Sequence, residues 1–370
     1  KMTPGMQILV AKKGKIVYRK NFGTLDYNPA HKVNDHTIYD LASLTKILAT
    51  LPELMRLYTK GDFRPNDTFE DLLPRLKDTN KGGMTMKEVL SHYAQFQSWI
   101  PFFNQTLDKD KKPLPEFYST TPSDSFPTQV AKDLYLREGF TDSIYKRIDD
   151  SNLIKDKKYL YSDLPYYYFK LFIEKKTKKP LQEAVQKHFY RELGAYQLTY
   201  LPLERFPITN IAPAEDEKTF RGQELRGYVH DQGAALLGGV GGHAGLFGTA
   251  DDVAKMMQMY LQKGYYGGTW YLQPQAIQLF NTCNYCTEGN RRGLGFDKPQ
   301  LGKAGPTCGC VPMESFGHTG FTGTFAWADP INEIVIVFLS NRTYPSAENK
   351  LLINKLIRQR VQEVVYKAGL

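Results

Sequence analysis

The chain has 370 residues, of which 41% are hydrophobic, and a formal net charge of +9. This length exceeds what one hydrophobic core usually supports, so two packed subdomains are expected. The basic residues form no stripe interleaved with aromatic residues, and no apolar run reaches about 18 residues, so neither nucleic-acid binding nor a membrane span is expected.

The N-terminal residues predict a β-hairpin followed by a helix. Two apolar runs within residues 7–18 flank a turn of lysine and glycine, which is the pattern of paired strands. No signal peptide precedes them, so we expect a mature chain or one domain cut from a longer protein. Apolar residues from Leu41 to Tyr58 recur at helical spacing, and Pro52 predicts a kink in that helix.

The middle of the chain, residues 62–194, is richer in helical patterning, and one helix is expected to begin near Asp163. Residues 238–248 are dense in glycine. No Gly-Lys-Ser/Thr sequence follows them, which disfavours a phosphate-binding loop. Thr249 then predicts the capped start of another helix.

The C-terminal residues predict two strands, at 323–327 and 334–339, and a final amphipathic helix over 347–367. Strands therefore occur near both termini, with helices between them. This order predicts one sheet built from both ends of the chain.

All four cysteines lie within 28 residues, in two closely spaced pairs: Cys283, Cys286, Cys308 and Cys310. Four thiolates in paired short spacings suit a structural zinc ion. Two disulfides are the competing interpretation and fit an oxidising compartment. A bond within Cys308-Gly309-Cys310 would be strained, so any disulfides are expected to join one pair to the other. Neither interpretation gives these cysteines a catalytic role.

The strongest local motif is Ser43-Leu44-Thr45-Lys46, at the start of the first predicted helix. Residues three apart share a helix face, so Ser43 and Lys46 are expected to lie side by side. A serine hydroxyl becomes a good nucleophile when a neighbouring base takes its proton. A lysine can be that base when burial or a nearby positive charge lowers its pKa.

Two further motifs follow in the chain. Tyr161-Ser162-Asp163 lies between a loop and a predicted helix, and His318-Thr319-Gly320 lies before a predicted strand. A tyrosine near the serine and lysine can pass a proton to a leaving group. A Thr-Gly pair on an edge strand can hydrogen-bond a substrate and supply an oxyanion-hole N–H.

These motifs, in this order, resemble those of the serine β-lactamase and penicillin-binding-protein superfamily, in its class C-like branch with carboxylesterases and D-aminopeptidases. The similar segments span nearly the whole chain: residues 41–46, 84–92, 161–164 and 317–323. A subgroup likeness, to serine-hydrolase-like domains fused behind glycoside hydrolase family three β-N-acetylglucosaminidases, is carried by residues 227–231, 242–247 and 292–296.

The resemblance implies a β-lactamase/transpeptidase-like fold of the α/β plus all-α class, with an antiparallel sheet flanked by helices and a helical subdomain. We expect an α/β subdomain formed by residues 1–60 and 205–370 and a mostly helical subdomain formed by residues 61–204. The active site is expected in the cleft between them.

The resemblance also assigns roles to the motif residues. Ser43 would be the acylated nucleophile, Lys46 its base and Tyr161 the second acid/base group. His318 would act at the substrate edge of the catalytic site, and the backbone N–H groups of Ser43 and Phe321 would form the oxyanion hole. The expected substrate-binding residues are Asp163, Thr319 and Gly320.

Two residues depart from the superfamily pattern. His318 replaces the lysine of a Lys-Thr-Gly triplet, so carboxylate binding is expected to be weaker and pH-dependent. Asp163 replaces an asparagine. An aspartate cannot donate to a substrate carbonyl and repels anions, and its simpler interpretation is a helix cap. Both changes disfavour an efficient β-lactamase and leave an esterase or amidase open.

The leading hypothesis is a serine hydrolase that forms a Ser43 acyl-enzyme on an ester, small amide or peptide, such as a cell-wall fragment. The alternatives are a β-lactamase or D-Ala-D-Ala carboxypeptidase, and a non-catalytic binding module of a fused glycosidase. No cofactor is expected for catalysis, with zinc only as a structural possibility. The expected partners are a small-molecule or peptide substrate and a fused N-terminal glycosidase domain, in the bacterial periplasm or outside the cell.

Overall fold

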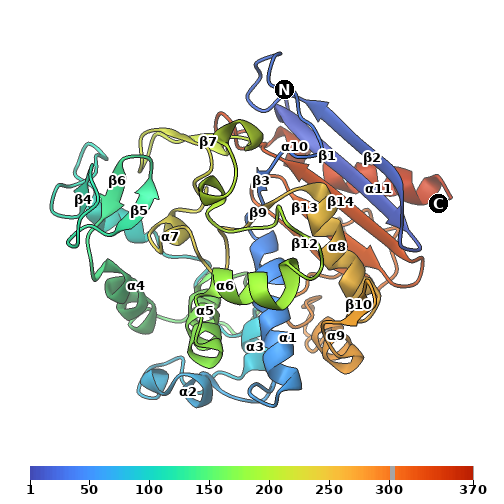
Figure 1. Cartoon of the computed structure of the whole chain (residues 1–370). Coiled ribbons are helices and arrows are strands. Elements are labelled where there is room, and N and C mark those ends of the chain that lie inside the picture. The colour runs from blue at the N-terminus through green and yellow to red at the C-terminus, as the bar shows by residue number, and fades with distance from the viewer. Residues whose placement is uncertain (301–304, 370) are drawn as a thin grey trace.

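The computed structural model describes residues 1–300 and 305–369, and a five-stranded antiparallel sheet forms one half of the molecule (Figure 1). Strand β1 pairs with β14, with Leu9 opposite Val337, so the two ends of the chain share one sheet, as predicted. The predicted N-terminal hairpin is also confirmed. The strands in spatial order are β12 (Phe316–Thr319), β13 (Phe325–Asp329), β14 (Ile334–Ser340), β1 (Gly5–Lys12) and β2 (Lys15–Gly23).

Both faces of this sheet are covered by helices, because successive side chains of a strand point to opposite faces. Leu9 and Val337 belong to the larger core, on the side of α8 (Ala250–Leu261). Val10 and Ile336 belong to a second core with the C-terminal helices. Figure 1 shows α8 and α11 on the two sides of the sheet. The result is a helix–sheet–helix sandwich.

The sequence predicted the start of α8 correctly but not the break in the C-terminal helix. Thr249 caps α8 by accepting a hydrogen bond from the backbone N–H of Asp252, as predicted. The expected single C-terminal helix is divided into α10 (Leu351–Asn354) and α11 (Ile357–Lys367). Between them Leu356 has a φ of 51°, which a continuous right-handed helix does not allow.

The remaining elements form the other half of the molecule and the connections to the sheet. The helices are α1 (Leu51–Thr59), α2 (Phe69–Leu72), α3 (Met86–Leu90), α4 (Phe140–Asp149), α5 (Leu164–Thr177), α6 (Leu181–Val185), α7 (Gln232–Ala235) and α9 (Pro274–Asn281). The short strands are β3 (Tyr39–Asp40), β4 (Tyr118–Ser119), β5 (Thr128–Ala131), β6 (Leu134–Leu136), β7 (Glu215–Asp216), β8 (Glu224–Leu225), β9 (Phe247–Gly248), β10 (Tyr265–Tyr266) and β11 (Thr269–Trp270). Strands β4, β6 and β5 form a small sheet within the stretch expected to be mostly helical. The proposed subdomain boundaries stay a prediction.

The first long helix changes its winding before Pro52. Residues 46–50 form a π-helical turn, in which the N–H of Leu51 donates to the carbonyl of Lys46, and α1 begins at Leu51. Pro52 stands in the first turn of α1, where a missing N–H leaves no hydrogen bond unmade. The kink at Pro52 stays a prediction, and the wide turn begins three residues after Ser43, where such turns often occur at functional sites.

The four cysteines form two disulfides, and each joins the members of one pair. The Cα atoms are 5.8 Å apart in Cys283–Cys286 and 5.2 Å apart in Cys308–Cys310, both within the range that a disulfide spans. Gly309, with a φ of 73°, lets the chain fold back between Cys308 and Cys310. The predicted pairing between the two pairs is wrong, and the thiols that a zinc ion would need are already oxidised. Among residues 1–300 and 305–369, no cluster of three or more metal-ligating side chains occurs.

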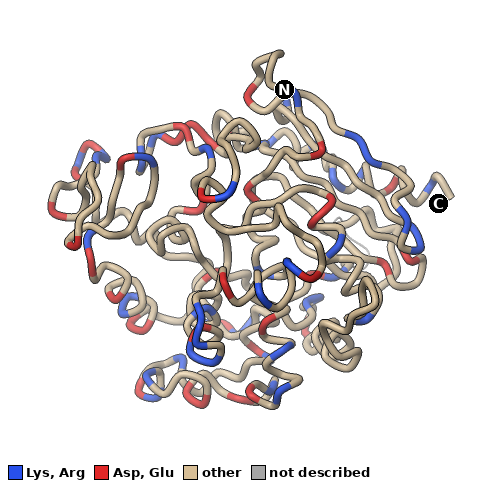
Figure 2. The backbone as a smooth tube through the Cα atoms, viewed as in Figure 1, with Lys and Arg blue, Asp and Glu red and all other residues tan. Residues whose placement is uncertain are grey.

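Basic and acidic residues alternate around the periphery in the view of Figure 2 rather than gathering in one region. Across the described part of the chain, no helix is both long enough and apolar enough to cross a bilayer.

Candidate active site

The nucleophile candidate Ser43 follows a tight turn between β3 and the first helix. Ala42 has a φ of 48°, a left-handed conformation that costs a non-glycine residue of order 1–3 kcal/mol. Asp40 holds this turn, because its Oδ1 accepts a hydrogen bond of 2.8 Å from the N–H of Ala42. The strain is local and supported, which is typical of a functional side chain being presented to a site.

The hydroxyl of Ser43 lies within hydrogen-bonding distance of both groups that the sequence placed beside it. Its Oγ is 3.0 Å from Lys46 Nζ and 2.9 Å from the hydroxyl of Tyr161. Lys46 and Ser43 belong to one helical segment, whereas Tyr161 comes from a loop 118 residues along the chain. The fold therefore brings together the hydroxyl, the amine and the phenol.

Lys46 is fully buried, and its ammonium nitrogen contacts three polar groups. Besides Ser43, it donates to the carbonyl of His243 at 3.0 Å and pairs with Asp163 Oδ1 at 2.6 Å. These contacts hold the Lys46 nitrogen against Ser43. Base catalysis by this amine requires that a proton first leave it.

Asp163 does not cap α5 through its side chain. It stands at the N-cap position, but no backbone N–H of the helix donates to its carboxylate. Its Oδ1 faces Lys46 instead. The helix-cap interpretation is therefore wrong, because the Asp163 carboxylate pairs with the buried Lys46 ammonium instead of a helix N–H. No bound molecule shows whether Asp163 contacts substrate, so its substrate-binding role stays a prediction.

Tyr161 is surrounded by groups that keep its phenol protonated. Burial, and then the negative charge of Asp163, raise the pKa of Tyr161 well above its ordinary value. The rings of His92 and His318 lie 4.6 Å and 5.8 Å from its ring. A protonated phenol that donates to Ser43 is suited to deliver a proton rather than to start as a base.

Strand β12 runs beside the nucleophile turn and ends at Thr319, directly before Gly320. A Cβ atom on Gly320 would lie 2.0 Å from Thr324 Oγ1 and 2.7 Å from the carbonyl oxygen of Leu41. Thr324 Oγ1 donates to that same carbonyl at 3.0 Å. Only glycine permits this close approach, which places partly exposed Thr319 at the end of the strand near Ser43.

His318, on the same strand, is buried and neutral. Burial, and then the charges of Arg292 and Lys46, lower its pKa well below the ordinary value. Its Nδ1 lies 2.7 Å from the carbonyl of Thr319, which assigns the proton to that nitrogen. The lowered pKa of His318 disfavours the partial positive charge expected from the sequence, because burial and then the nearby Arg292 oppose a protonated ring.

The backbone N–H groups of Ser43 and Phe321 have no acceptor within the described residues. Ser43 follows Leu41 and Ala42, and Gly320, which precedes Phe321, lies against both of them. The two N–H groups therefore belong to neighbouring segments, as an oxyanion hole requires. The Phe321 ring itself is 55% exposed and packs on Arg342 and His230, with the Arg342 guanidinium 4.6 Å from the ring centre.

Arg292 is the site residue that sequence reasoning missed. Its guanidinium lies 5.2 Å from the centre of the Tyr161 ring, and its Nη2 is 3.5 Å from Asp297. It is only 4% exposed, yet its Nε and Nη1 have no hydrogen-bond partner in the described part of the chain. Buried donors are normally paired, so these two nitrogens leave capacity for an acceptor.

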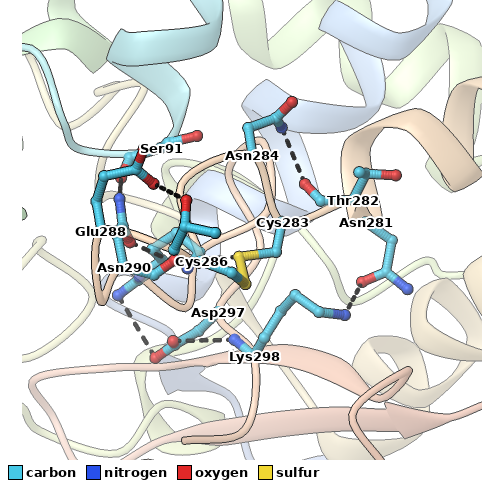
Figure 3. Close-up of a disulfide and its surroundings, with 12 residues drawn as sticks. Ser91, Asn281, Thr282, Cys283, Asn284, Cys286, Glu288, Asn290, Asp297 and Lys298 are labelled. Carbon is cyan, nitrogen blue, oxygen red and sulfur yellow. Dashed lines mark hydrogen bonds and ion pairs between the residues drawn. A yellow bond between two sulfur atoms is a disulfide. The ribbon is translucent and has the colours of Figure 1, made fainter.

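The loop that carries Arg292 is anchored to the same region as Tyr161. Asn290 donates to the carbonyl of Ser91 and accepts from the backbone N–H of Arg292. Figure 3 shows Asn290 beside the Cys283–Cys286 disulfide, with Ser91 above it. In the sequence, Arg292 stood out only as part of the Arg-Gly-x-Gly segment. That segment indicated a subgroup of the superfamily but did not predict that Arg292 lies beside Tyr161.

The chain also matches known proteins along most of its length. The family model described as "Beta-lactamase" matches residues 1–358. The chain belongs to the β-lactamase family. As a member of this family it is a serine hydrolase, and the family requires no cofactor for catalysis.

One curated protein and two solved structures illustrate what this β-lactamase-family chain is similar to. An Escherichia coli K12 protein provisionally named a D-alanyl-D-alanine carboxypeptidase is 30% identical over 92% of this chain and 79% of its own. EstCE1, a hydrolase with promiscuous acyltransferase activity, superimposes with a TM-score of 0.65 at 18% identity, covering 95% of this chain and 93% of that one. A penicillin-binding-protein homologue from Caulobacter crescentus gives 0.65 at 17%, covering 92% and 87%. The fold class predicted from the sequence is confirmed.

Proposed function

We propose that this protein is a carboxypeptidase-like serine hydrolase that cleaves the last amide bond of a short peptide, such as a cell-wall fragment ending in a D-amino acid. Ser43 Oγ forms a bond to the scissile carbonyl carbon while neutral Lys46 takes the hydroxyl proton. The C–N bond breaks as Tyr161 delivers a proton to the leaving nitrogen, and Lys46 reprotonates Tyr161. Water then cleaves the ester, which releases the acid and restores Ser43.

One observation carries the choice of a substrate with a free carboxylate: the unpaired donors of Arg292. In the superfamily pattern a lysine of the Lys-Thr-Gly triplet supplies the cation that faces a carboxylate. His318 stands there and is neutral, but Arg292 supplies a permanent charge beside Tyr161. A guanidinium with free donors suits a carboxylate better than an ester oxygen. The name of the E. coli relative points in the same direction.

The roles of the other site residues follow from this proposal. Thr319 and Gly320 would bind the substrate along β12. His318, on the same strand, would contribute an uncharged side chain to the substrate edge of the site. The N–H groups of Ser43 and Phe321 would stabilise the oxyanion. Two disulfides support a periplasmic or extracellular location. A fused glycosidase domain stays a prediction.

Two alternative enzymatic functions are β-lactam hydrolysis and simple ester hydrolysis. The alternative without catalysis is a binding module. The contacts of Ser43 with Lys46 and Tyr161 favour an enzyme over a module. The neutral His318 disfavours efficient β-lactam hydrolysis, and the buried charge of Arg292 disfavours a carboxylate-free ester as the preferred substrate.

The proposal is tested by mass spectrometry and by one pair of substrates. Incubation with a penicillin or a fluorophosphonate should add mass at Ser43, and the Ser43→Ala variant should show none. N-acetyl-D-Ala-D-Ala should be hydrolysed faster than its C-terminal amide by about 10- to 100-fold in kcat/KM, the effect of a charge-assisted hydrogen bond. Absence of any adduct would support the binding module, and equal rates for acid and amide would remove the carboxypeptidase assignment.

A further inference from the structure

A cavity of about 20 Å³, room for one water-sized group, adjoins the side of Lys46 that faces Asp163. Two of its lining residues contact Lys46 directly: Asp163 through its carboxylate and His243 through its backbone carbonyl. The cavity is therefore one side chain away from Ser43. Its lining residues are Trp99, Ile100, Phe103, Asp163, Leu164, Tyr167, Asp231, Gln232, Gly233 and His243.

The polar part of this wall is acidic. The side chains of Asp163 and Asp231 are 26% and 33% exposed, so a ligand can reach both carboxylates. Burial alone would raise the pKa of Asp231, but His243 and the N–H of Ala234 lower it below its ordinary value, which keeps Asp231 ionised. Among the described residues that line the cavity, none is lysine or arginine.

His243 adds a second, independent observation. Its side chain is 2% exposed, its Nε2 lies 2.8 Å from Asp231 Oδ1, and its Nδ1 is buried with no partner in the described chain. When Nε2 carries the proton that faces the Asp231 carboxylate, Nδ1 is an acceptor that lacks a donor.

Aromatic residues complete the cavity. Tyr167 stacks on His243 with ring centres 4.5 Å apart, and Trp99, which is 56% exposed, lies at the rim. Aromatic faces attract cations, and apolar residues such as Phe103 suit the methylene groups of an amine. Carboxylates, an unpaired acceptor and aromatic rings all interact favourably with an ammonium group.

We infer that this cavity binds a primary ammonium group carried by the acyl part of the substrate. The inference rests on the proposed acyl-enzyme at Ser43 and specifies which acyl groups reach it. The substrate would have a positive group on the Lys46 and Asp163 side and its carboxylate on the Tyr161 and Arg292 side. A short zwitterionic peptide has this polarity. Asp163, which departs from the superfamily pattern, is then a specificity-determining residue.

The experiment measures kcat/KM for substrates that differ only in acetylation of one amine. D-Ala-D-Ala is compared with N-acetyl-D-Ala-D-Ala, and a peptide ending in L-Lys-D-Ala-D-Ala is compared with its side-chain-acetylated form. The first pair places the ammonium next to the scissile bond and the second places it farther away. The free amine should be preferred by about 10- to 100-fold in at least one pair.

Variants connect this preference to the cavity. Asp163→Asn should reduce the preference by about tenfold, and Trp99→Ala should reduce it by about twofold to fivefold. Because Asp163→Asn also disturbs Lys46, the readout is the ratio between paired substrates within one variant. If Asp163→Asn is inactive, the substrate ratio measured in Trp99→Ala tests whether the preference depends on this cavity. Asp62→Asn is the matched control, since Asp62 pairs with Lys176 and does not line the cavity, and it should leave the ratio unchanged.

A third pair separates this inference from the proposed function. D-alanyl p-nitroanilide and its N-acetyl form carry no carboxylate, so they report the ammonium preference even if the protein is not a carboxypeptidase. Ratios within about twofold in all three pairs would overturn the inference while leaving the acyl-enzyme intact. A preference that survives both Asp163→Asn and Trp99→Ala would overturn its assignment to this cavity.

Discussion

Two buried cations lie near the ring of Tyr161, and they differ in what their donors do. Lys46 is 5.1 Å from the ring centre, donates two hydrogen bonds within the protein and forms an ion pair with Asp163. Arg292 is 5.2 Å from it and has two nitrogens without a partner in the described residues. The first cation is satisfied by the protein and is suited to proton transfer within it. The second has two buried donors without a partner, an unusual condition that the proposed binding of a substrate carboxylate would explain.

The largest expected effect comes from removing the satisfied cation. Lys46→Met keeps the length of the side chain but cannot accept a proton from Ser43. We expect kcat/KM to fall by about 1000-fold or more, the scale of losing a general base together with its hydrogen bonds. The measurement is D-alanine release from N-acetyl-D-Ala-D-Ala. Activity within about tenfold of the wild type would show that Lys46 is not the base.

Removing the unsatisfied cation should act more selectively. In Arg292→Met, kcat/KM for the peptide with a free carboxylate should fall by about 10- to 100-fold, while that for the C-terminal amide should change by less than about threefold. The preference for carboxylate would then be lost. As a matched control, Arg291→Met removes a neighbouring arginine whose guanidinium is already paired with Asp297. Equal losses for acid and amide would mean that Arg292 only supports the loop.

The smallest effect concerns stability rather than activity, and it follows from the histidines beside the two cations. The pKa of His318 is held well below 6.5, so below about pH 6.5 the unfolded chain binds a proton at this residue that the folded chain does not. Stability should therefore decrease as pH falls, by up to about 1.4 kcal/mol per pH unit for this histidine. His92 is expected to act in the same direction.

Denaturant unfolding between pH 4 and 7 checks this prediction. The dependence of the free energy of unfolding on pH should be weaker in His318→Asn than in the wild type. His36→Asn, at an exposed position, is the control and should keep the wild-type dependence. If His318→Asn keeps the full dependence on pH, the neutrality of His318 is not what makes the protein sensitive to acid.

Features that depend on short stretches of sequence could be predicted. The β1–β2 hairpin and the cap of α8 by Thr249 follow from residue type and local spacing, and so does the contact between Ser43 and Lys46. The family resemblance supplied the fold. The proximity of Tyr161 to Ser43 is a contact across 118 residues, and the order of the motifs anticipated it only through that resemblance.

Two other features could not be read from the sequence pattern, because one depends on a distant partner and the other on the local backbone conformation. Asp163 occupies a helix-cap position in sequence, yet its charge is taken by Lys46. The cysteine spacing left zinc and disulfides open, and the left-handed turn at Gly309 allowed the pairing that spacing had disfavoured.

The sequence by itself determined the terminal hairpin, the contact of Ser43 with its adjacent amine and the family, because these rest on side-chain periodicity and motif order along the chain. Only the tertiary structure decided which charges surround Tyr161. Arg292 lies 131 residues away from it in sequence, and its position depends on the anchoring of Asn290 to Ser91. Electrostatic neighbours are set by packing, since Coulomb interactions depend on distance in space and not on separation along the chain.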